Sequence, residues 1–137
     1  MEDEKARPAP GAPQEVHPPK YANGGTVSWK AKDPLGCEIA LYLETEAHIL
    51  AGHPEMKAYL DAVKLTIEDP VLIQRDGIDG TTCFYYRMAN RNFHKHRDIY
   101  VSVVVQRGET SGRVKTAHLV KTLRSNPGET LWIKSSK

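Results

Sequence analysis

The spacing of apolar residues changes along the chain, from the periodicity of helices to that of strands. A short helix is expected over residues 45–51 and ends at Gly52. A second helix begins at Pro54, because a proline in the first turn loses no hydrogen bond, and Asp69-Pro70 ends it. Its apolar residues recur at intervals of three and four and so share one face: Met56, Leu60, Val63 and Ile67.

The chain after the second helix has the pattern of β-strands. Strands are expected over residues 71–74, 82–88, 99–105 and 114–120, with a last apolar run at 131–133. Before the helices, residues 26–29 and 37–43 flank Asp33-Pro34-Leu35-Gly36, whose proline and glycine favour a turn. We therefore predict an α+β fold, with an N-terminal hairpin and two helices packed on a meandering antiparallel β-sheet of about four strands.

Prolines are concentrated at the start of the chain. The first twenty residues hold five of the nine prolines and no aromatic side chain. Such a segment buries too little apolar surface to offset the entropy lost on ordering. We predict a disordered leader over residues 1–22 and a single domain over residues 23–137, which suits a chain of 137 residues of which 39% are apolar.

Charge and hydropathy exclude several classes of protein. The net charge of +2 is too small for a protein that coats duplex DNA. The longest uncharged apolar run, residues 99–105, is far below the roughly 20 residues that cross a bilayer, and the first ten residues do not resemble a secretory signal. Cys37 and Cys83 lack the paired spacing of a zinc or redox motif. A soluble cytoplasmic protein with reduced cysteines and no membrane partner is expected.

Two histidines flank the break between the predicted helices. On an uninterrupted helix, His48 and His53 would point about 140° apart, but the break at residues 52–54 frees His53 to turn back towards His48. Because imidazoles gain and lose protons near neutral pH, the pair suits acid–base catalysis across a phosphodiester. The alternative is a structural role for both, with His48 half-buried on the helix and His53 ordering the junction.

A second cluster is basic. Residues 87–97 carry four formal positive charges and no acid: Arg87, Arg91, Lys95 and Arg97. Arginine and lysine provide the salt-dependent part of nucleic-acid binding, and Phe93 in the same stretch is suited to base stacking. The alternative is a solvated loop that keeps the protein soluble.

Residue spacing indicates whether a metal site can form and which side chains of the later strands share a face. His48, His53 and Glu55 lack the spacing of a zinc-protease helix, so we predict no metal site and no cofactor. By strand alternation Thr116 and His118 share a face, and Arg87 shares the face of Tyr85 and Cys83, opposite Phe84 and Tyr86.

A series of short motifs occurs in order over residues 33–132. They are His48-Ile49-Leu50, His53-Pro54-Glu55-Met56, Glu68-Asp69-Pro70, Tyr85-Tyr86-Arg87, the strand at residues 100–105, Thr116-Ala117-His118 and Leu131-Trp132. Together they resemble the small phage-associated members of the barnase, EndoU, colicin and RelE nuclease superfamily. His118 stands where an aromatic residue is expected in similar sequences, so no role is assigned to it.

The resemblance implies helices packed on an antiparallel sheet and a metal-independent ribonuclease site on the open sheet face. We predict an endoribonuclease, a phage or mobile-element toxin or effector, that leaves 2′,3′-cyclic phosphate ends. His48 and His53 would supply base and acid, Arg87 would stabilise the phosphate charge and Thr116 would orient a phosphate oxygen. Arg91, Lys95 and Arg97 would bind RNA, and an antitoxin or immunity protein is a further expected partner. The alternative is a non-catalytic module that keeps the fold and binds nucleic acid or protein.

Overall fold

The computed structural model describes residues 25–90, 99–123 and 127–135. Along the chain the elements are β1 (Val27–Lys32), β2 (Glu38–Tyr42), α1 (Leu43–Gly52), the 3₁₀ helix η2 (Pro54–Tyr59), α2 (Leu60–Glu68), β3 (Leu72–Asp76), β4 (Thr82–Asn90), β5 (Ile99–Arg107), β6 (Ser111–Val120) and β7 (Pro127–Ile133). The predicted leader at residues 1–22 lies outside the described residues. In the part of the chain that is described, no helix is long and apolar enough to span a membrane.

The α+β class is confirmed, but the predicted sheet is wrong. Seven strands form one mixed sheet in the order β1-β2-β6-β5-β4-β3-β7, not a meander of about four. The expected N-terminal hairpin is not a separate layer packed on the sheet, because β1 and β2 pair antiparallel and β2 then joins β6 in parallel at residues 38–40. At the other edge β7 returns to pair with β3. Both additions are long-range pairings, which residue periodicity along the chain does not encode.

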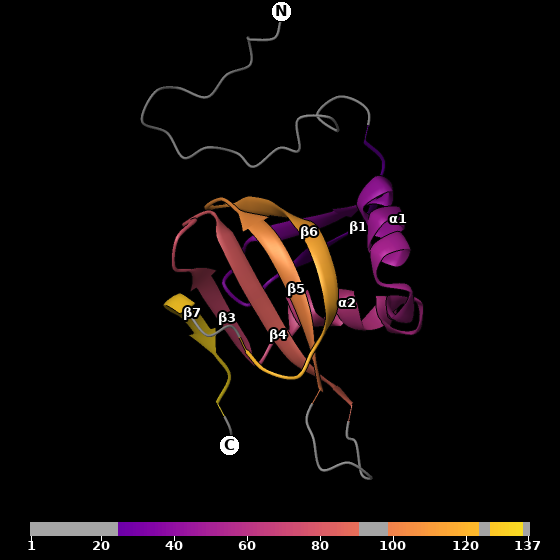
Figure 1. The fold of residues 1–137 in the computed structure, drawn as a ribbon. Helices are drawn as coiled ribbons and strands as arrows, with labels where there is room; N and C mark the ends of the chain where they lie inside the picture. The colour runs from indigo at the N-terminus through magenta and orange to yellow at the C-terminus, as the bar shows by residue number, and fades with distance from the viewer. Residues whose placement is uncertain (1–24, 91–98, 124–126, 136–137) are drawn as a thin grey trace, which may run out of the picture.

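The helices cover one face of this sheet and leave the other open. In Figure 1, β4, β5 and β6 face the viewer, α2 lies partly behind them, and α1 lies beside β6. The covered face holds the core, in which Met56, Val63 and Ile67 of the predicted helical stripe pack with Val101 and Val103 of β5. Three of the four predicted stripe residues are therefore in the core, whereas Leu60 is half-buried and is not part of it. The first turns of the predicted helix form the 3₁₀ helix η2 rather than α-helix.

The turn between β1 and β2 is fixed by a buried carboxylate. Asp33 Oδ1 accepts hydrogen bonds from the backbone N–H groups of Leu35 and Cys37, both at 2.9 Å, and Gly36 completes the turn at φ +91°, where a side chain would be strained. Asp33 Oδ2 accepts a 2.6 Å hydrogen bond from the Tyr85 hydroxyl and pairs with Arg107 at 3.2 Å. This network ties the N-terminal turn to β4 and β5.

Candidate functional site on the open sheet face

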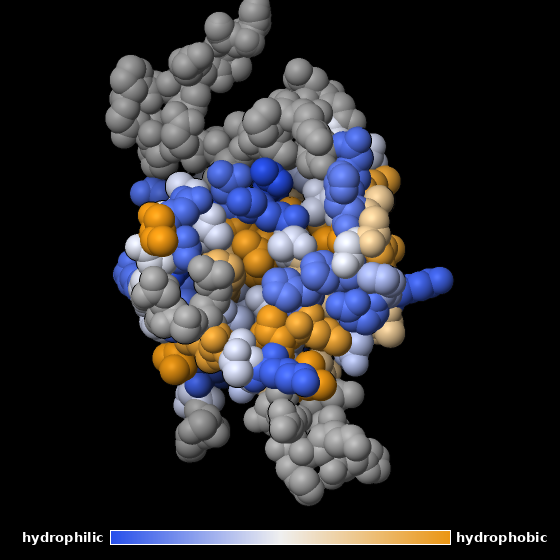
Figure 2. Space-filling view, in the orientation of Figure 1, coloured by the Kyte–Doolittle hydropathy of each residue, from blue (hydrophilic) through white to orange (hydrophobic). Residues whose placement is uncertain are grey.

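A cleft lies on the sheet face that the helices leave open. It has a volume of about 400 Å³ and is lined by Phe84, Tyr86, Ser102, Val104, His118, Val120, Thr122 and Leu123. In the same view, Figure 2 shows hydrophobic residues reaching the surface in the middle of this face, with hydrophilic residues around them. The molecule therefore has a hollow with a mixed apolar and polar lining on its open face.

Strand register brings the lining residues together. Tyr86 on β4 pairs with Ser102 on β5, which pairs in turn with His118 on β6, so these three side chains form one row across the sheet. Phe84 and Val104 form the neighbouring row. Phe84 and Tyr86 are only 7% and 1% exposed, so they close the floor of the cleft. Residues 122–123, which follow β6, complete the wall.

His53 stacks on His118 at the border of this cleft. The two ring centroids are 5.1 Å apart and the ring planes differ by 20°. His53 lies between α1 and η2, and both of these helices contact β6. They pack beside the part of β6 that follows residues 111–113, which pair with β2, and this packing places His53 next to His118. His53 Nδ1 also lies 3.6 Å from Glu55 Oε2, which forms an ion pair when the imidazole is protonated. The predicted turn-back of His53 thus occurs, but towards His118.

His118 and His53 differ in how far they are buried. Burial lowers the pKa of His118 below its usual value, and the neighbouring His53 lowers this pKa further, while Glu55 acts in the opposite direction. His118 Nδ1 is buried and has no hydrogen-bond partner among the described residues. His53 is more exposed and lies beside a carboxylate. At neutral pH the lowered pKa keeps His118 neutral.

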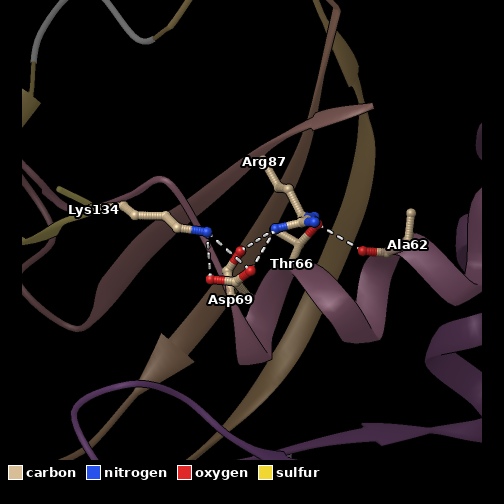
Figure 3. A network of polar contacts seen from close by, with 5 residues as sticks. All are labelled: Ala62, Thr66, Asp69, Arg87 and Lys134. Atoms are coloured by element: carbon tan, nitrogen blue, oxygen red, sulfur yellow. Dashed lines mark hydrogen bonds and ion pairs between the residues drawn. The ribbon is translucent and has the colours of Figure 1, made fainter. Parts of the chain in front are cut away.

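Arg87 lies on the opposite side of the sheet from the cleft. Its guanidinium donates to the Asp69 carbonyl at 2.7 Å and to Asp69 Oδ2 at 2.9 Å. Lys134 Nζ reaches the same carboxylate at 3.0 Å, and in Figure 3 Arg87 and Lys134 approach Asp69 from two sides. These hydrogen bonds from Lys134 and Arg87 hold the pKa of Asp69 below its usual range. Arg87 therefore does not share a site with His53, because Asp69 at the end of α2 holds it on the covered face of β4.

The other predicted site residues have different positions. His48 is exposed on α1, and the described ring contact of His53 is with His118. Thr116 pairs with Val104 and lies two residues before His118, on the cleft side of β6. Arg91, Lys95 and Arg97 lie outside the described residues. Within residues 25–90, 99–123 and 127–135, no group of three or more histidine, cysteine or acidic side chains is arranged to hold a metal ion.

Sequence reasoning did not assign His118 to the site. The available signal was the strand alternation that places Thr116 and His118 on one face, but alternation alone does not show which face is open. Comparison with protein-family models, curated proteins and solved structures gives no match to this chain. The function is therefore inferred from the chemistry of the cleft residues.

Proposed function

We propose that the protein is a metal-independent endoribonuclease in which His118 is the general base and His53 the general acid. The observation that carries this proposal is the stacked histidine pair at the border of an open cleft. One imidazole is partly buried with a lowered pKa, and the other is more exposed beside Glu55. Acid–base catalysis needs a neutral base, which the lowered pKa of His118 favours, and a proton donor beside it, which is the role proposed for His53.

The reaction follows from these two roles. Because His118 Nδ1 is buried, Nε2 is the nitrogen that takes the proton from a ribose 2′-hydroxyl. The 2′-oxygen then attacks the adjacent phosphorus, the bond to the 5′-oxygen breaks, and His53 donates its proton to that leaving oxygen. The products are a 2′,3′-cyclic phosphate and a 5′-hydroxyl. DNA is not cleaved, since it lacks the nucleophile.

Two other groups of residues have supporting roles in this proposal. Thr116, on the cleft side of β6, orients a phosphate oxygen. Arg91, Lys95 and Arg97 provide the salt-dependent phosphate contacts. Arg87 is not part of the mechanism, because Asp69 holds it on the other side of the sheet. A phage or mobile-element toxin controlled by an antitoxin or immunity protein is the corresponding biological role.

The test is incubation of the purified protein with mixed RNA in EDTA, followed by analysis of the fragment ends. The proposal requires cleavage in EDTA, cyclic phosphate and 5′-hydroxyl ends, and intact DNA in a parallel reaction. Cleavage that stops in EDTA, or fragments with 5′-phosphates, would refute it.

One observation favours a second function, a module that binds nucleic acid without cutting it. Arg87, the cation expected to stabilise the phosphate, is paired with Asp69, and among the described residues the cleft lining contains no lysine or arginine. Without a cation to stabilise the charge that develops on phosphorus, catalysis loses its usual largest contribution. Salt-sensitive RNA binding with no cleavage of any RNA would establish this second function.

A further inference from the structure

We infer that the cleft is a nucleobase subsite, which restricts the protein to unpaired RNA. This inference rests on the proposed function in one respect, that the ligand is RNA. The cleft has a volume of about 400 Å³, within the range of sites that hold small organic groups. His118 belongs both to this lining and to the histidine pair. A base in the cleft is therefore next to the phosphate that the pair would act on.

The chemistry of the lining selects the base rather than the phosphate. At neutral pH none of the eight lining residues is charged, since the lowered pKa of His118 keeps its imidazole neutral. An anion gains nothing from such walls and loses its hydration. A planar, uncharged ring instead removes apolar surface of Val104, Val120 and Leu123 from water, while Ser102 and Thr122 place hydroxyl groups at the wall for its polar edge.

The shape of the cleft explains why the base must be unpaired. Phe84 and Tyr86 close the floor, and residues 122–123 form a side wall, so the ligand has to enter from the open side. A base in a duplex is stacked and paired, and it reaches such a pocket only after it leaves the helix at a cost of a few kcal/mol. Single-stranded loops present their bases without this cost. We therefore expect single-stranded RNA to be bound and duplex RNA to be rejected.

The subsite is tested with ligands that cannot be cleaved. The four 2′-deoxynucleoside 3′-monophosphates are titrated into the ¹⁵N-labelled protein, with inorganic phosphate as the comparison. Contact of a base with apolar or aromatic side chains contributes about 1–3 kcal/mol, so at least one nucleotide should bind about fivefold or more tightly than phosphate. The amide shifts should centre on Tyr86, Ser102 and Thr122. Equal affinity for phosphate and all four nucleotides, or shifts centred elsewhere, would overturn the inference.

Two variants that fill the cleft test whether the base binds there. Thr122→Trp and Val120→Phe add bulk to the lining and should abolish the preference for nucleotide over phosphate. Ile78→Trp enlarges a side chain that is 87% exposed in the β3–β4 turn and should leave this preference unchanged. Thermal melts establish that each variant is folded. If both cleft variants keep the preference, the base does not bind in the cleft.

The same data separate this inference from the proposed ribonuclease activity. Base-dependent binding in a protein that cleaves no RNA leaves the subsite standing and refutes the catalysis. Cleavage that persists in the absence of base-dependent binding refutes the subsite alone.

Discussion

Replacing Asp33 with alanine should destabilise the fold more than removal of any exposed carboxylate. The Asp33 side chain is 0% exposed and accepts hydrogen bonds from the Tyr85 hydroxyl, two backbone N–H groups and the Arg107 guanidinium. Arg107 is itself only 11% exposed. Alanine would therefore leave a largely buried guanidinium without its counter-charge and would also remove the hydrogen bonds that hold the β1–β2 turn.

The expected loss is large compared with the stability of a small domain. Removing one partner of a buried ion pair typically costs about 3–5 kcal/mol, and small domains have a total of about 5–15 kcal/mol. Since Arg107 retains some access to water, we expect a loss of about 3 kcal/mol for Asp33→Ala. Tyr85→Phe removes two hydrogen bonds to charged groups, one donated to Asp33 and one accepted from Arg107, but leaves the Asp33–Arg107 pair, and should cost about 2–3 kcal/mol.

Urea denaturation monitored by tryptophan fluorescence measures this loss. The matched control is Asp79→Ala, because the Asp79 carboxylate also accepts hydrogen bonds from a turn, at Thr81 and Thr82, but is exposed to solvent. The midpoint should fall much further for Asp33→Ala than for Asp79→Ala, with similar denaturant slopes. Equal losses in the two variants would refute the stabilising role of the buried network.

Three further predictions concern ionisable and reactive groups. The pKa of His118 is lower in the folded than in the unfolded state, so unfolding takes up a proton below about pH 6.5. Stability should therefore fall as the pH drops through this range, and His118→Phe should weaken that dependence. Equal profiles of melting temperature against pH for the two proteins would contradict this prediction. Burial raises the pKa of the Cys83 thiol, and Cys37 is buried as well, so both should resist iodoacetamide in the native protein and react in urea, as mass spectrometry would show. Asp69→Asn should weaken the ties of α2 to Arg87 and Lys134 and lower the melting temperature at low salt, and an unchanged value would argue against that contribution.

Local structure was largely predictable from the sequence, and long-range pairing was not. The periodic stripe of Met56, Leu60, Val63 and Ile67 predicts a buried helical face, and three of these four residues are in the core, because this signal depends only on residues a few positions apart. The parallel pairing of β2 with β6 and the pairing of β3 with β7 join segments that are far apart in the sequence. No periodic signal specifies these partners, so the sheet was predicted with too few strands.

In the candidate site, too, local structure was predictable from the sequence and long-range contacts were not. The break at residues 52–54 correctly indicated that His53 leaves the direction of α1, but its partner is set by the packing of α1 and η2 beside β6. Alternation on β4 placed Arg87 with Tyr85 and Cys83, away from Phe84 and Tyr86, and the structure shows that this is the covered face. Because Arg87 alternates with the cleft residues Phe84 and Tyr86 along β4, it cannot have a role in the cleft.

The central claim, that His53 and His118 form the catalytic pair, is tested most directly by rates of RNA cleavage in EDTA for three single variants. Loss of one acid–base partner typically removes about 10²- to 10⁴-fold of the rate, so His53→Ala and His118→Ala should each fall by this factor. His48→Ala, which changes an exposed histidine on α1, is the matched control and should cleave at the wild-type rate. Wild-type rates in His118→Ala, or a loss in His48→Ala as large as in His53→Ala, would contradict the account.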